Sequence, residues 1–194
     1  TVSTEKALAY KSYLSSASQN WQTEDAVDRQ AWTTFAQTKT SIDRLGKSIS
    51  LSAHNWYVRL NSRLLAAGES FISIPPVDPP PGVAVVTSWT VDVLTGKTSL
   101  VYTPSPLPAG VGLWIRAAKV QSPTIINVQN LLTTILITPG AQTSPINLES
   151  ELVEAFGPIQ EGATYVLEIR AFDRTTGLVG GRVYARTVAV DTTP

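Results

Sequence analysis

The chain has 194 residues, a formal net charge of +0 at pH 7 and only 15% charged residues. Because neither half of the chain carries a run of basic residues, the charge pattern predicts no binding to nucleic acid, whose phosphate backbone requires one. The absence of cysteine excludes a disulfide framework and a thiolate zinc site, and no apolar run approaches the ~20 residues of a membrane span.

Three helices are predicted in the first part of the chain, because apolar residues recur there at helical spacing. They are Tyr10, Leu14, Ala17 and Trp21 in residues 4–20, Val27, Ala31 and Phe35 with Trp32 alongside in residues 23–38, and Trp56, Leu60 and Leu64 beside Tyr57 in a helix between Ser52 and Gly68. Thr23 and Ser52 are the predicted N-caps, since a hydroxyl there can accept from the backbone N–H groups of the first turn.

The tryptophans of these helices, Trp21, Trp32 and Trp56, are predicted to be core residues. A helical unit this small needs large side chains to bury enough area, and this reading is favoured over exposed rings that stack on bases or sugars. His54 is the only histidine of the chain, and no carboxylate lies near it at metal-ligand spacing. The sequence therefore predicts neither a metal site nor a cofactor site.

Residues 75–82 read PPVDPPPG, with five prolines in eight positions. Prolines at this density are incompatible with a helix interior or a central strand. The segment therefore predicts an extended linker between a helical domain of residues 1–74 and a β-domain of residues 83–194.

Beyond this linker, short β-branched or alternating segments bounded by Pro and Gly predict an antiparallel β-sandwich. The predicted strands are residues 84–94, 99–103, 111–121, 131–138, 165–173 and 182–190, with a short strand near Ile146. Residues 148–156, in which Leu152 and Phe156 are four positions apart, predict a short helix. The expected fold class is α+β multidomain: a small three-helix unit, a Pro-rich linker and a C-terminal sandwich.

Two stretches of the β-domain resemble a known family. Residues 159–173, IQEGATYVLEIRAFD, resemble the tyrosine-corner strand of fibronectin type III domains, with Ile159 where that family has a leucine six residues before Tyr165. Residues 100–104, LVYTP, resemble the second-strand motif, with Tyr102 at the position of the usual tryptophan. The resemblance implies a fibronectin type III-like or related immunoglobulin-like sandwich, a fold that is nearly silent on function.

The whole chain loosely resembles uncharacterised bacterial and phage-associated proteins. In these, a Trp-rich helical segment like residues 21–35, 41–52 and 61–68 precedes a Pro-rich linker and a fibronectin-like domain. The resemblance implies a virion or extracellular location.

Catalytic motifs are missing from the sequence. It contains no Gly-rich phosphate loop and no G-x-S-x-G elbow. Glu149, Glu151 and Glu154 could form a carboxylate pair of the glycosidase kind, but their spacing is that of an ordinary solvated helix face, so a hydrolase ranks third. We therefore expect no catalytic residue and no enzyme activity.

A candidate contact surface lies in residues 111–118. Alternation places Leu113 and Ile115 on one face of the strand and Trp114 with Arg116 on the other. If the aliphatic face is core, Trp114 is exposed beside Arg116 and forms a contact for a sugar or another subunit. A buried Trp114 is an equal alternative.

A second candidate is the uncharged run 131–137, which contains Leu131 and Ile135. Such a run is an aggregation hazard at an open sheet edge, so something should cover it. The cover is either the sandwich itself or a neighbouring chain by strand addition.

The leading hypothesis is a non-enzymatic structural subunit of a virion, capsid- or tail-associated, or of an extracellular filament. Depletion of charge is typical of interface cores, so copies of this chain or a capsid or shell protein are the expected partners, and a homo-oligomer is expected. The helical half would anchor, and the sandwich would be displayed or bridge subunits. The alternative is a carbohydrate-binding or adhesion module of a secreted protein, with a polysaccharide as partner.

Overall fold

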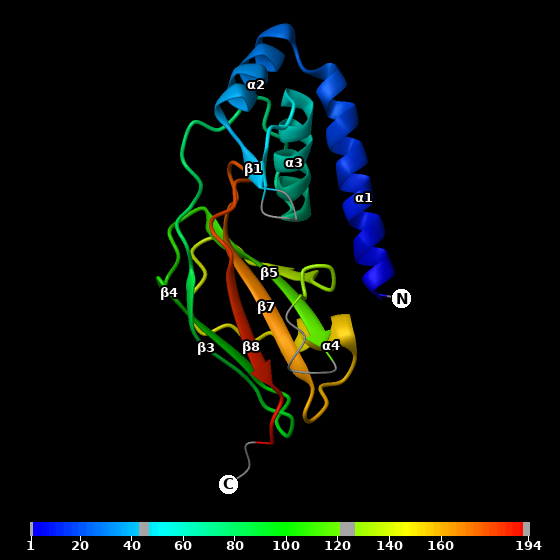
Figure 1. The fold of residues 1–194 in the computed structure, drawn as a ribbon, viewed down its shortest axis with the longest axis vertical. Helices are drawn as coiled ribbons and strands as arrows, with labels where there is room; N and C mark the ends of the chain where they lie inside the picture. Colours follow the sequence, from blue (N-terminus) through cyan, green and yellow to red (C-terminus); the bar gives the residue numbers. More distant parts are fainter. Residues whose placement is uncertain (1, 43–46, 121–126, 192–194) are drawn as a thin grey trace. The chain divides into compact units, whose positions relative to one another are not determined.

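The structure, a computed structural model, describes residues 2–42, 47–120 and 127–191 (Figure 1). The chain forms two compact units, each described below by itself. One consists of Thr4–Pro79 together with Arg174–Leu178, and the other contains Pro80–Asp173 and the chain from Val179 onward. Nothing in the sequence pattern indicated that Arg174–Leu178 belongs with the helices, and the boundaries at residues 74 and 82 stay predictions.

The helical unit contains the predicted helices and one hairpin. Its elements are α1 (Val2–Asn20), the 3-10 turn η1 (Trp21–Thr23), α2 (Ala26–Thr38), the antiparallel strands β1 (Ser41–Ile42) and β2 (Ser48–Ile49), and α3 (Ala53–Ala66). Ser52 caps α3 as predicted, since its hydroxyl accepts from the N–H of Asn55 at 3.2 Å.

The predicted N-cap of α2 was wrong. The carboxylate of Asp25, not the hydroxyl of Thr23, accepts from the N–H of Asp28 at 2.8 Å. The hydroxyl of Thr23 instead donates to the carbonyl of Asn20 at 2.7 Å and closes η1. Both residues are good caps, and the extra 3-10 turn moves the start of α2 past Thr23.

The core of the helical unit is made mainly by α2 and α3. Trp32, Tyr57 and Leu60 have no exposed surface, and Trp56 is 7% exposed. The aromatic rings meet edge to face, as in the Trp32–Tyr57 pair with centroids 5.3 Å apart. Val27, predicted on the buried face of α2, is 76% exposed because it lies in the first turn, ahead of the buried residues.

A buried carboxylate forms the polar centre of this unit. Glu24 is 8% exposed and accepts from the Tyr57 hydroxyl at 2.5 Å, from the Asn20 amide at 3.1 Å and from the Ser73 hydroxyl at 3.3 Å. Burial, and then the hydrogen bond to Glu24, raises the pKa of Tyr57 well above its usual range. The carboxylate of Glu24 therefore joins the end of α1 (Asn20), α3 (Tyr57) and the chain that follows α3 (Ser73).

Arg174–Leu178 completes the helical unit by packing on α3 and the chain that follows it. Arg174 forms an ion pair with Glu69 at 2.5 Å and donates to the carbonyl of Ala67 at 2.8 Å. Leu178 is 9% exposed and belongs to the same apolar cluster as Trp32. A unit this small therefore takes part of its core from a segment distant in the sequence.

Gly177 allows this segment to approach the helix backbone. Its φ is +73°, and a Cβ at this position would lie 2.6 Å from the carbonyl oxygen of Leu60. Arg63 also donates to the carbonyl of Gly177 at 3.3 Å. Any side chain at position 177 would meet both a backbone clash and an unfavourable conformation.

The β-unit contains the six principal predicted strands and the predicted short helix. They are β3 (Val85–Val91), β4 (Thr98–Thr103), β5 (Val111–Val120), β6 (Thr133–Ile137), α4 (Glu149–Phe156), β7 (Thr164–Asp173) and β8 (Val183–Val188). The predicted end of the third strand, Gln121, lies outside the described residues. The short strand predicted near Ile146 is an isolated antiparallel bridge between Ile146 and Leu100.

The strands form two antiparallel sheets around one core. β3 pairs with β4, and the larger sheet has the order β6-β5-β7-β8. One buried apolar cluster includes residues of both sheets, among them Trp89 and Leu100 from the first and Ile115 and Leu167 from the second. β3 and β8 lie side by side and are joined by a parallel bridge between Asp92 and Val190 (Figure 1). The α+β class is confirmed, and the sheets are compatible with a β-sandwich.

Candidate contact surface on the four-stranded sheet

The two faces of β5 separate as alternation requires. Leu113 and Ile115 have no exposed surface and point into the core, whereas Trp114 and Arg116 lie on the outer face and are half-buried. The placement of Trp114 is therefore intermediate between the two alternatives considered for it. Trp114 and Arg116 therefore both lie on the outer face of the sheet and not in the core.

Trp114 is held in one orientation on that face. Its indole Nε1 donates to the hydroxyl of Thr134 on β6 at 3.0 Å. Its ring meets the buried ring of Phe172 edge to face, with centroids 5.7 Å apart and an interplanar angle of 88°. Because the donor and one ring contact are used within the unit, Trp114 is less available as a flat stacking platform than the sequence predicted.

Arg116 belongs to a row of three residues in register on adjacent strands. It lies opposite Glu168 of β7, which in turn lies opposite Tyr184 of β8. Arg116 forms an ion pair with Glu168 at 3.2 Å, and the Tyr184 hydroxyl donates to the other carboxylate oxygen at 2.8 Å. Arg116 also donates to the carbonyl of Leu132 at 2.9 Å. A carboxylate that is 1% exposed is thus compensated by a charge and a neutral donor.

Tyr184 is the exposed end of this row. Its side chain is 45% exposed although its hydroxyl is held by Glu168. Burial, and then the hydrogen bond and the negative charge of Glu168, raises the pKa of Tyr184. The hydroxyl is thus held within the sheet while much of the side chain remains accessible to solvent.

Beyond Tyr184, the outer face of β8 is unusually apolar. We define the β8 face as the exposed residues Tyr184, Arg186, Val188 and, just after the strand, Val190. Val188 is 39% exposed and Val190 is 47% exposed. An antiparallel strand with one solvated face normally alternates apolar and polar residues. Here three of the four outward positions, Tyr184, Val188 and Val190, are apolar or aromatic. The sequence signal for this face is the run Val183-Tyr184-Ala185, in which consecutive residues, and hence both faces of the strand, are apolar or aromatic; it was not recognised.

Part of the outer face of β5 and β7 is covered by the unit itself. Val166 of β7, 3% exposed, packs in one cluster with Val120 and with Val128 of the loop that follows β5. Ala118 is only 1% exposed. This cover does not include the β8 face, whose residues are exposed.

The other predicted contact residues, Leu131 and Ile135, do not form one surface. Ile135 is 5% exposed and shares the core cluster with Leu152 of α4, which contacts β6. Ile135 is therefore covered by the β-unit itself and not by a neighbouring chain, which was the other alternative. Leu131 lies before β6 and is 51% exposed.

The two tyrosines expected to be structural are both buried in the core of the β-unit. Tyr102 is 2% exposed, and its hydroxyl donates to the carbonyl of Gln142 at 2.8 Å. Tyr165 has no exposed surface, but its hydroxyl makes no hydrogen bond. Burial raises the pKa of Tyr165, and the nearby backbone of Gln160 acts in the opposite direction without reaching hydrogen-bond geometry. The upstream hydrogen bond expected of a tyrosine corner is therefore not formed.

In the helical unit, Trp21 is only partly buried. It packs on the Tyr57 ring at 5.1 Å and on the His54 ring at 5.9 Å, and the guanidinium of Arg29 lies 5.7 Å from its centre. The Nε2 of His54 lies 3.2 Å from the hydroxyl of Ser18. His54 thus lies among packing contacts between α1 and α3.

Among the residues that the structure describes, no three histidine, aspartate or glutamate side chains gather closely enough to hold a metal ion. No helix in the described ranges is long and apolar enough to cross a membrane.

Comparison with known proteins finds no family model that matches the chain and no curated protein that matches it significantly.

Proposed function

We propose that this protein is a non-enzymatic structural subunit of a virion, capsid- or tail-associated, or of an extracellular filament. In this proposal the helical unit anchors the subunit, and the β-unit is displayed or bridges to neighbouring subunits. The proposal needs a surface on the β-unit that is built for protein contact.

The β8 face is the observation that carries this proposal. Tyr184, Val188 and Val190 are each between 39% and 47% exposed on the outer face of one sheet. At ~25 cal/mol per Å² of apolar surface, covering such side chains favours association, and exposed apolar patches of this kind mark contact sites. Arg186 lies among these side chains, and its charge would contribute more to the choice of partner than to affinity.

The strand order supports a sandwich of the fibronectin type III or immunoglobulin kind. β3 and β4 correspond to the first two strands of that fold, and β6-β5-β7-β8 corresponds to its C′-C-F-G sheet. The bridge between Ile146 and Leu100 takes the place of strand E. This fold is widely used for display and adhesion, so it is in keeping with a structural role and does not by itself require one.

The function is tested by sedimentation velocity on the full chain over a wide concentration range, followed by electron microscopy of the species found. We expect concentration-dependent assembly. A monomer at every concentration would contradict the proposal.

The alternative, a carbohydrate-binding module, is favoured by one observation only. Tyr184 presents an aromatic ring beside Arg186, a combination that can stack on a sugar and bond its hydroxyls. Binding of the monomer to a polysaccharide, lost in Tyr184→Ala or Trp114→Ala and kept in Tyr10→Ala, would establish this alternative.

A further inference from the structure

The helical unit has a docking site that is filled by a distant part of the same chain. We define the α3 site by the residues that receive this segment on α3 and just after it: Leu60, Arg63, Ala67 and Glu69. The occupant is Arg174–Leu178. Glu69 forms an ion pair with it, the carbonyl of Ala67 accepts a hydrogen bond from it, and Arg63 donates one to it.

The α3 site is selective for the sequence of this segment. A Cβ at Gly177 would lie 2.6 Å from the carbonyl oxygen of Leu60, so the occupant requires a glycine there. Leu178 then enters an apolar cluster in which every other described member lies between residues 21 and 72. A basic residue, a glycine and a leucine at this spacing therefore identify the occupant, and a second copy of this chain carries the same three residues.

The site and its occupant are far apart in the chain. Arg63 and Gly177 are separated by 114 positions. Between them lies the whole of Pro80–Asp173, which has an apolar core of its own. The entropic cost of closing a loop rises with the length of chain between its ends. The copy's own segment therefore has only a modest advantage over the same segment of a neighbour that is held close by.

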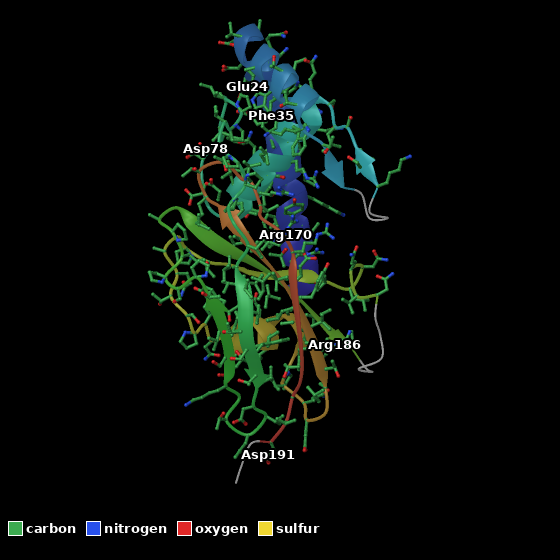
Figure 2. All side chains as sticks on the ribbon, turned by 60° about the vertical axis from the view of Figure 1, so that its left-hand side comes forward. Glu24, Phe35, Asp78, Arg170, Arg186 and Asp191 are labelled. Atoms are coloured by element: carbon green, nitrogen blue, oxygen red, sulfur yellow. The ribbon has the colours of Figure 1, made fainter. Side chains whose placement is uncertain are left out.

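The linker between the two units can take another course without the loss of buried contacts. Residues 77–80 are all exposed. Figure 2 labels Asp78 among them, and it labels Phe35 in the apolar cluster that receives Leu178. The prolines of residues 75–82 keep the linker extended, which lengthens its reach towards a second copy. Exchange of a segment between copies requires no new contact, because the contacts within one chain form again between two.

We propose that two copies of this chain exchange Arg174–Leu178 reciprocally, so that the α3 site of each copy receives the segment of the other. This rests on the proposed function, for which it names a second copy as the partner of the helical unit. Reciprocal exchange keeps Leu178 buried in both copies, whereas a one-way exchange would leave one site empty. The contact is separate from the β8 face and uses none of its residues.

The ion pair permits a direct test on the full chain. Arg174→Glu alone or Glu69→Arg alone places like charges in every α3 site, both in the single chain and in a homodimer. When the two variants are unfolded and refolded together, only an exchanged heterodimer places opposite charges in both sites. We expect native mass spectrometry to find heterodimers at least about tenfold in excess over homodimers. The matched control is Lys11→Glu refolded with Glu161→Arg, at two exposed charges outside the site, and it should show no such excess.

A cross-link tests the exchange without reversal of charge. The chain contains no cysteine, so Glu69→Cys in one copy and Arg174→Cys in another introduce one thiol each. After the two variants are refolded together, a short bismaleimide should join them at least about tenfold faster than it joins Glu161→Cys with Arg174→Cys, because docking raises the effective concentration of the thiols. Circular dichroism on each variant separates a folding defect from a lost contact.

Two results would overturn the inference. Heterodimers of the charge variants no more frequent than those of the control mixture would mean that each copy keeps its own segment. Equal cross-linking rates for Glu69→Cys and Glu161→Cys would mean the same. Assembly of the unmodified chain alongside either result would leave the proposed function standing, whereas a monomer at every concentration would contradict both.

Discussion

Arg174 and Glu69 form an ion pair at 2.5 Å although 105 positions separate them in the sequence. Together with Leu178 and Gly177, this pair makes Arg174–Leu178 part of the helical unit. The helical unit is therefore built from two stretches of chain.

Replacing Leu178 with Ser should weaken the helical unit by about 2–3 kcal/mol, because a polar group then occupies a buried apolar position. Arg174→Ala should cost about 1 kcal/mol or less, because the ion pair is partly exposed. Hydrogen exchange of α3 amides reports both changes. Equal protection in Leu178→Ser and the unmodified chain would contradict the role of this segment.

Cleavage at a protease site inserted between Val77 and Asp78 should leave two fragments that elute together. Val77 is 93% exposed, so the site is accessible, and the second fragment retains Arg174–Leu178. Leu178→Ser should promote separation of the fragments on size-exclusion chromatography. Complete separation without that substitution would mean that the helices hold together without the segment.

Tyr102→Phe should destabilise the chain by about 1 kcal/mol, because the buried hydroxyl bond is lost and the carbonyl of Gln142 keeps only the N–H of Leu107 as a donor. Tyr165→Phe is the matched comparison, and it should change stability by less than about 0.5 kcal/mol because its hydroxyl has no partner to lose. Urea unfolding measures both. A loss at Tyr165 as large as that at Tyr102 would indicate that the tyrosine-corner bond forms in solution.

Glu168→Ala should destabilise the β-unit by about 2–3 kcal/mol, because Arg116 and the Tyr184 hydroxyl lose their shared acceptor. Combining Arg116→Met with Glu168→Leu should recover most of this loss, since an apolar pair of similar size replaces the buried charges. Glu161→Ala, at an exposed carboxylate, is the control. A thermal unfolding temperature of Glu168→Ala equal to that of Glu161→Ala would argue against a structural role for the Arg116–Glu168 pair.

The protein should lose stability above pH 10. The pKa values of Tyr57, Tyr102, Tyr165 and Tyr184 are all raised in the folded chain. Their contribution is complete below the unfolded value of about 10 and is lost as the pH rises above it, because the unfolded chain then releases protons that the folded chain retains. Part of the rise in absorbance at 295 nm should coincide with the loss of circular dichroism, and Tyr57→Phe should shift that part and the unfolding to higher pH. Ionisation of all six tyrosines before unfolding would contradict the burial of these hydroxyls.

Much of the fold could be predicted because local signals determine it. Turn residues and β-branched runs mark the strands, and Ser52 caps α3 by a contact three residues away. The cap of α2 was mispredicted because Thr23 and Asp25 are both good caps, and the geometry of η1 decides between them. Local preference alone cannot rank two competing caps two positions apart.

Long-range features were less accessible. Arg174–Leu178 has the composition of a hairpin loop, and its packing on α3 depends on contacts distant in the sequence, such as the approach of Gly177 to Leu60 and the burial of Leu178. The Trp114 face followed from alternation, but the contacts with Thr134 and Phe172 that restrain the ring depend on register between strands. The β8 face was missed because its significance depends on which parts of the sheet Val128 covers.

The most direct test of the account is high-resolution electron microscopy of the assembled full chain. We expect an assembly in which neighbouring subunits meet through the β8 face. A chain that remains monomeric at all concentrations and binds a polysaccharide, with binding lost in Trp114→Ala, would contradict it.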